Sequence, residues 1–334
     1  MDSVTQIVLG AAIGEAILGK KVGNRAIFWG AIAGTLPDLD VFMRLFVDDL
    51  TATEMHRSFS HSFLFSFIFA PIFGWLAFKI HKNESATWKE CTMLMFGSIV
   101  THPLLDAHTN WGTQLFWPLD YRVAYKNIFI IDPLYTVPFM ILLICAMRLK
   151  RGNPKRRTYN NLGLIISSSY MILTLIFKGV SYQHFISSLN NKKVNYTEIE
   201  TNPTPFNSLL WTATVETQES YLVGYYSLFD GSDEVDFIEF KKNHELLSGM
   251  ANEDVVKRLI KLSDGWYLVV KEGDKINFND MRFGQTEMNS DPNSFVFSHT
   301  LWYDNGKLQI KKRDPSFKNV GAAFKSFMVR IGGK

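Results

Sequence analysis

Long apolar runs in the first half of the chain constrain its fold more than any other feature. Six segments are dominated by apolar residues, at about 4–19, 24–37, 62–80, 91–108, 130–148 and 161–178. A helix that crosses a membrane needs about 20 apolar residues. The third, fifth and sixth segments reach this length, the fourth comes close, and the first two are short. We therefore expect an integral membrane protein.

The two short segments are rich in small residues, as in GAAIGEAILG and GAIAG. Small residues let helices pack closely in a membrane. We expect these segments to be tilted, partly inserted or buried inside the bundle. The N-terminal stretch MDSVTQ lacks a basic region and a clean cleavage site, which argues against a removable signal peptide.

Polarity returns after residue 180. Residues 181–205 contain Asn and Lys repeats and TNPTP, which predict a linker. Short apolar-aromatic stretches follow, with a hairpin signal at Asp304-Asn305-Gly306 and helical periodicity over 252–263. The expected fold is an all-α, multi-spanning bundle of about six hydrophobic helices over 1–180, followed by a soluble, mainly antiparallel β (α+β) domain over 206–334.

Composition excludes several classes of protein. The two cysteines, Cys91 and Cys145, both lie in apolar segments, so a disulfide framework and a cysteine zinc finger are excluded. No dense basic stripe with interleaved aromatic residues indicates nucleic-acid binding.

The basic residues predict an orientation. If all six segments cross, the links after the first, third and fifth segments share one side. Those links hold twelve Lys and Arg residues, against four in the links on the other side. The positive-inside rule puts the richer side in the cytoplasm. We therefore expect an inner-membrane protein whose polar C-terminal domain is extracytoplasmic.

Four polar clusters fall at segment ends, and in this topology all reach the outer side. They begin with Asp2 and Gln6, then Asp38 and Asp40 of PDLD, then HRSFSH (His56, Arg57, His61), then His102, Asp106 and His108. Asp132 lies at the same level. The topology used only Lys and Arg, so this agreement is independent support for a shared site.

The residue types in these clusters are typical of metal ligands. His102 and Asp106 are four residues apart and share one helical face. Of Asp38 and Asp40, only one needs to point into the site, and His56 and His61 flank a turn. Nitrogen and carboxylate ligands without thiolate suit Zn²⁺ or Mn²⁺. We expect Asp38, His56, His61, His102 and Asp106 to hold metal, with Asp2, Gln6, His108 and Asp132 as additional candidates.

Structural roles remain open for each cluster. His102 and Asp106 can form a hydrogen-bonded pair, PDLD can end a helix, and HRSFSH can cap an interfacial helix. His81, His184, His244 and His299 are interpreted as surface residues, and Glu15 as the maker of a helix–helix hydrogen bond.

The motifs MDSVTQIVLGAAIGE, GAIAGTLPDLD, HRSFSHS, HPLLDAHTNWGTQLFWP and IDPLYTVP occur in this order. Over residues 1–180 the chain resembles the YdjM-like inner-membrane proteins, described as membrane-bound metal-dependent hydrolases and distantly similar to zinc-dependent phospholipases C. The resemblance implies metal ligation by Asp38 or Asp40, by His56 or His61, and by His102 with Asp106. Many members carry a histidine at the position of Gln6, so that ligand is missing here or replaced by Asp2.

Two hypotheses follow. The first is a membrane-embedded hydrolase in which zinc activates water against a phosphoester or related ester of a membrane lipid or lipid-linked substrate. Arg57 and Asp40 are its catalytic candidates, with Arg57 steadying a developing oxyanion. The alternative is a non-enzymatic membrane protein, either a transporter or an envelope-remodelling factor, that uses the cluster for structure or ion binding.

Overall fold

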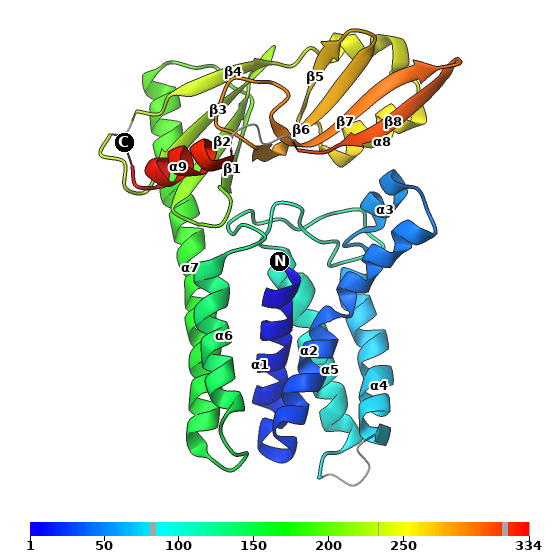
Figure 1. Cartoon of the computed structure of the whole chain (residues 1–334), viewed down its shortest axis with the longest axis vertical. Coiled ribbons are helices and arrows are strands. Elements are labelled where there is room, and N and C mark those ends of the chain that lie inside the picture. The colour runs from blue at the N-terminus through cyan, green and yellow to red at the C-terminus, as the bar shows by residue number, and fades with distance from the viewer. Residues whose placement is uncertain (81–84, 233, 316–319, 334) are drawn as a thin grey trace. The chain divides into compact units, whose positions relative to one another are not determined.

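Two compact units make up the computed structural model, which describes residues 1–80, 85–232, 234–315 and 320–333 (Figure 1). Unit 1 comprises Met1–Leu175 with Pro205–Asn207, and unit 2 comprises Ile176–Thr204 with Ser208–Lys334. His81 lies outside the described residues. The long helix α7 runs from one unit into the other.

Unit 1 is built from helices. Its elements are α1 (Ser3–Val22), α2 (Asn24–Thr35), the 3-10 helix η1 (Pro37–Leu45), α3 (Asp49–Met55), the 3-10 helix η2 (Phe59–His61), α4 (Phe63–Ile80), α5 (Trp88–Asp106), α6 (Pro133–Met147) and the first part of α7 (Pro154–Asn191). Helices α1, α2, α4, α5 and α6 are held together by two apolar clusters of buried side chains.

Fewer helices meet the requirements for a membrane span than the six apolar segments predict. Among the described residues, α4 and α7 are long and apolar enough, and α2 with η1 forms a third candidate that is bent by 47°. The prediction of six crossings is not supported. Helix α6 has only 15 residues, whereas α1 and α5 carry Glu15 and the His102–Asp106 pair among their apolar residues.

Glycines allow α1 and α2 to form a very close antiparallel pair. A Cβ atom on Gly14 would overlap the carbonyl oxygen of Ala26, and a Cβ on Gly10 or Gly30 would overlap the other residue's carbonyl oxygen. A Cβ on Gly34 would lie 2.7 Å from the carbonyl oxygen of Gln6. The small residues noted in the sequence thus bring the two backbones into contact, which places the ends of both helices beside α5.

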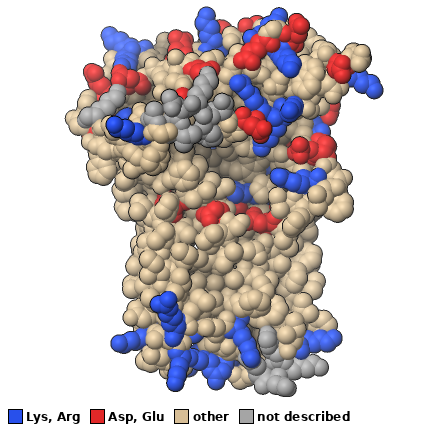
Figure 2. Space-filling model, viewed as in Figure 1, with Lys and Arg blue, Asp and Glu red and all other residues tan. Residues whose placement is uncertain are grey.

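The two ends of the unit 1 bundle differ in charge. Exposed basic residues gather where α1, α4 and α6 end and where α2, α5 and α7 begin, as the lower end of Figure 2 shows. At this end Glu15 forms a buried ion pair with Arg156 of α7, whose Nε lies 2.6 Å from Glu15 Oε1. The predicted interhelical hydrogen bond of Glu15 is therefore present, with a charged partner.

The described residues of unit 2 form two four-stranded antiparallel sheets. The first has the order β1 (Glu198–Pro203), β2 (Leu210–Glu216), β3 (Ser220–Ser227) and β4 (Phe237–Lys241). The second has the order β5 (Tyr267–Glu272), β6 (Lys275–Gln285), β7 (Phe295–Asp304) and β8 (Lys307–Arg313). Its helices besides α7 are η3 (His244–Met250), α8 (Asp254–Leu262) and α9 (Val320–Ile331).

The sequence predicts much of unit 2. The mainly antiparallel β fold is confirmed, α8 occupies the predicted helical stretch, and Asn305 and Gly306, both with positive φ, turn β7 into β8. Strands β1 and β6 and helix α9 were not predicted. The stretch 181–205, predicted as a linker, holds the end of α7 and all of β1. His184 and His244 stack on Tyr226 and Tyr267, respectively.

Candidate metal centre

Four side chains from three elements converge at the end of unit 1 opposite the basic residues. They are Asp38 of η1, His61 of η2, and His102 and Asp106 of α5, and one ligand atom of each lies within 4.8 Å of the others. His61 Nε2 lies 3.1 Å from His102 Nε2, 3.5 Å from Asp38 Oδ1 and 3.4 Å from Asp106 Oδ2. His102 Nε2 lies 3.3 Å from Asp38 Oδ1 and 3.6 Å from Asp106 Oδ2.

Local structure explains why these residues meet. The i,i+4 spacing puts His102 and Asp106 on one face of α5, as the sequence predicts. The chain bends by 47° between α2 and η1, and this bend turns Asp38 toward α5. Close packing of α1 on α2 also positions Gly34, whose carbonyl oxygen lies 2.6 Å from His102 Nδ1. The close packing of α1 on α2 therefore helps to fix the orientation of His102 in the cluster.

Hydrogen bonds orient both imidazoles with Nε2 toward the centre. Because a carbonyl oxygen only accepts, His102 Nδ1 donates to Gly34 and the neutral ring carries a lone pair on Nε2. Ser60 Oγ donates to Asp40 Oδ2 at 2.9 Å, so it can accept from His61 Nδ1, also at 2.9 Å. In their neutral forms, both histidines direct lone pairs at the same small volume.

The two oxygens of Asp106 have different surroundings: one accepts hydrogen bonds, and the other makes ion-pair contacts without hydrogen-bond geometry. Its Oδ1 contacts the amino group of Met1 and accepts from Gln6 Nε2 at 2.9 Å. Its Oδ2 is buried and makes no hydrogen bond within the described part of the chain. Arg57 Nε lies 3.0 Å from this oxygen as an ion pair, without hydrogen-bond geometry. A buried carboxylate oxygen without a hydrogen-bond donor is costly, and the charge of Arg57 offsets part of this cost. A metal ion at the same oxygen would offset more of it.

Acceptors around His61 make the centre attractive to positive charge. Burial by itself would lower the pKa of His61, but the carboxylates of Asp106, Asp38 and Asp40 outweigh it and raise the pKa to about 9. In the absence of a metal, these carboxylates favour a proton on His61. A cation that enters must displace this proton, so its uptake is favoured as pH rises.

The spacing of the four ligand atoms suits tetrahedral coordination. Ligand atoms about 2.0–2.2 Å from a tetrahedral zinc ion lie about 3.3–3.6 Å from one another. Five of the six separations between these atoms run from 3.1 to 3.6 Å, and all six lie within 4.8 Å. Two nitrogen and two carboxylate ligands, with no thiolate, are a set that zinc accepts. The residues present therefore fit such an ion.

Asp40 and His56 lie beside the four ligands and form a pair of their own. Asp40 Oδ1 lies 2.9 Å from His56 Nδ1, and Asp40 Oδ2 accepts from the backbone N–H of Arg57 at 3.0 Å. Arg57 adopts a positive φ of 59°, rare for a side chain of this size, and its buried Nη1 donates to Thr109. This backbone turn separates His56 from His61, so the structure does not bring His56 into the ligand set.

The other candidates from the sequence have different surroundings. Asp2 caps α1 and Asp132 caps α6, each accepting from two backbone N–H groups. His108 Nδ1 lies 2.8 Å from Asn127 Oδ1, and Gln6 contacts Asp106 from outside the four ligands. The sequence analysis missed Ser60, Thr109 and the carbonyl of Gly34. All three residues lie inside quoted motifs, HRSFSHS, HPLLDAHTNWGTQLFWP and GAIAGTLPDLD, but no spacing rule distinguishes them from their neighbours.

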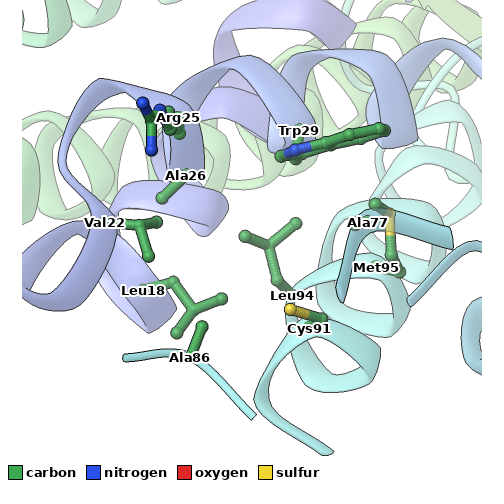
Figure 3. A pocket seen from close by; sticks show the side chains of 10 residues that line it. All are labelled: Leu18, Val22, Arg25, Ala26, Trp29, Ala77, Ala86, Cys91, Leu94 and Met95. Atoms are coloured by element: carbon green, nitrogen blue, oxygen red, sulfur yellow. The ribbon is translucent and has the colours of Figure 1, made fainter. Parts of the chain in front are cut away.

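A small apolar pocket lies elsewhere in unit 1, near the basic end of the bundle. Figure 3 shows the side chains that line it, which are Leu18, Val22, Arg25, Ala26, Trp29, Ala77, Ala86, Cys91, Leu94 and Met95. None of these belongs to the four-residue cluster, so the pocket is not part of the metal centre.

Comparison with known proteins gives two matches. A family model described as YdjM inner membrane protein matches residues 1–185. Inner membrane protein YbcI of Escherichia coli (strain K12) is 29% identical over 114 residues. That alignment covers 34% of this chain and 64% of YbcI, less than two thirds of the relative's length. No solved structure matches the chain.

Proposed function

Because the chain belongs to the YdjM family of inner membrane proteins, we propose that it is a membrane-embedded, metal-dependent hydrolase that acts on a phosphoester. The observation that carries this proposal is the convergence of Asp38, His61, His102 and Asp106, whose ligand atoms lie close enough together to hold one cation. Zinc is the ion we propose, since its preferred ligands and distances match. When bound, it would lower the pKa of a water molecule toward neutrality.

The neighbouring residues supply the remaining chemistry in this proposal. Asp40 positions His56 by a direct hydrogen bond and His61 through Ser60, which bonds to both Asp40 and His61. His56 is part-exposed, its ring centroid is 5.9 Å from that of His61, and it is the side chain available to pass a proton to a leaving group. Arg57 places a buried positive charge beside Asp106. There it would stabilise negative charge that develops on a substrate in the transition state.

Activity tests this proposal with a water-soluble aryl phosphodiester as the probe. We expect the detergent-purified chain to hydrolyse the probe, a chelator to abolish the reaction and zinc to restore it. The variant His56→Gln should keep its metal and lose about 10²–10⁴-fold in rate, the typical contribution of a positioned proton donor. A rate that chelation leaves unchanged would contradict the proposal.

One observation favours the non-enzymatic alternative. Four protein ligands complete a tetrahedron, as in structural zinc sites, whereas catalytic sites usually keep a position for water. The exposure of Asp38 favours the catalytic alternative. Its side chain is 27% exposed, while those of the other three ligands are fully buried. Displacement of Asp38 would open the site to solvent. A chain that holds zinc but cleaves no phosphoester would support the structural alternative.

We propose that the metal centre and unit 2 are extracytoplasmic, because the basic end of the bundle should face the cytoplasm. In a background without native cysteines, Asp274→Cys at the exposed β5–β6 turn should react in intact cells with a maleimide that cannot cross the inner membrane. The control Gly152→Cys, in the exposed α6–α7 link, should react only after the membrane is opened. The reverse pattern would overturn this orientation.

A further inference from the structure

The helix that carries Asp38 also carries an unusually apolar surface. On η1 and the residue after it, Leu39, Phe42, Leu45 and Phe46 are exposed, the last two by 73% and 79%. A second exposed apolar segment, with Phe116 and Leu119, follows α5. We call these six side chains the apolar rim. Apolar patches of this kind on a protein usually mark a contact with another molecule or with lipid.

Contacts connect the second part of the rim to the start of the membrane-span candidate α4, and the first part lies on another span candidate. Phe63, the first residue of α4, donates its backbone N–H to Leu115 at 2.9 Å, and its ring packs on Phe116. Phe59 of η2 packs edge-on against Trp117 at 5.0 Å between ring centroids. Helix η1 itself forms, with α2, the bent span candidate. The rim is therefore continuous with surfaces that are apolar enough to face lipid.

The acidic and the apolar side chains of helix η1 have different surroundings. Asp38 and Asp40 face the metal centre and its neighbours, whereas Leu39 and Phe42 are open. Arg44 is exposed on the same helix, as expected for a segment at a lipid–water boundary where a long basic side chain reaches phosphate groups. Apolar surface and the one solvent-accessible ligand of the cluster thus lie on a single nine-residue helix.

We propose that the apolar rim lies in the lipid–water interface and holds the acyl chains of a membrane phospholipid while its phosphate reaches the metal centre beside Asp38. This inference rests on the proposed function and names its substrate class, a phospholipid taken directly from the bilayer. The rim shields the chains from water, and the position of Asp38 on the same helix keeps the phosphate close to the ligands.

Spin labels test the lipid contact independently of activity. The chain, without its native cysteines, is placed in nanodiscs of phosphatidylethanolamine and phosphatidylglycerol and labelled at Phe46→Cys. We expect the label to be accessible to oxygen and protected from a water-soluble nickel chelate. A label at Asp274→Cys, on the exposed turn in unit 2, is the aqueous control. Equal nickel accessibility at both positions would overturn the inference, whether or not the protein is an enzyme.

Hydrolysis in the same nanodiscs tests the substrate class. We expect the wild type to cleave the long-chain phospholipids, and the variant Phe42→Ser/Leu45→Ser/Phe46→Ser to cleave them at least tenfold more slowly while it retains its metal. Cleavage of the soluble phosphodiester alone would overturn the phospholipid inference and leave the proposed function intact. If neither substrate is cleaved, the proposed function and the phospholipid substrate both fail, and the spin labels still decide whether the rim contacts lipid.

Discussion

Replacement of His102 by alanine is expected to remove metal binding. His102 Nε2 lies within 3.6 Å of ligand atoms of His61, Asp38 and Asp106, so its loss opens one corner of the tetrahedron. Even loss of an outer hydrogen-bond partner typically reduces metal affinity about 10–100-fold. Loss of a ligand should exceed this, and Asp106→Asn should act similarly because it removes the charge that faces the cation.

Metal analysis and thermal unfolding measure this effect together. A ligand present at 100 times its Kd stabilises the folded state by about 2.7 kcal/mol. Zinc should therefore raise the Tm of the wild type and leave that of His102→Ala unchanged. His108→Ala is the matched control, since this histidine lies at the same end of α5 but bonds to Asn127. Retention of metal by His102→Ala at the wild-type level would contradict the assignment.

Substitution of Gly14 by alanine is expected to disrupt the packing of α1 on α2. The new methyl group would overlap the backbone oxygen of Ala26, which cannot move aside as a flexible side chain can. Overpacking usually costs about 1–3 kcal/mol, and the upper end applies where the obstacle is backbone. Any separation of the helices also shifts the Gly34 carbonyl that orients His102, so metal affinity should fall as well.

Unfolding in detergent and metal titration test the Gly14→Ala variant. Gly179→Ala is the control, because this glycine lies inside α7, and its new methyl group would meet no described atom within 4 Å beyond the backbone of its own helix. There the same change should stabilise the chain by about 0.5–1 kcal/mol through helix propensity. Equal stability of the two variants would show that the glycines do not determine the α1–α2 contact.

Residue spacing predicts the part of the site that lies on one helix. His102 and Asp106 share a face because a step of four residues is slightly more than one helical turn, and the structure places them together. The sequence leaves open the choice between Asp38 and Asp40 and between His56 and His61. That choice depends on the bend before η1 and on the positive φ of Arg57, which arise from tertiary contacts rather than from periodicity.

The fold, like the site, could be predicted from the sequence only in part. Apolar runs separate the helical half from the β-rich half, but they do not distinguish a membrane span from a buried helix. Helix α5 shows why, since its apolar residues serve a packed interior beside polar ligands. Strand β6, with KINFNDMRFGQ, was missed because polar side chains such as Asn277 and Asn279 are buried in it, so the expected alternation is absent.

The proposed function requires that Asp38, His61, His102 and Asp106 hold one metal ion. X-ray absorption on wild-type protein, purified without chelator and quantified for metal, tests it most directly. We predict one zinc ion per chain with two nitrogen and two oxygen ligands at about 2.0–2.2 Å. Protein that contains no zinc and takes none up, or zinc bound by ligands that persist in His102→Ala, would contradict it.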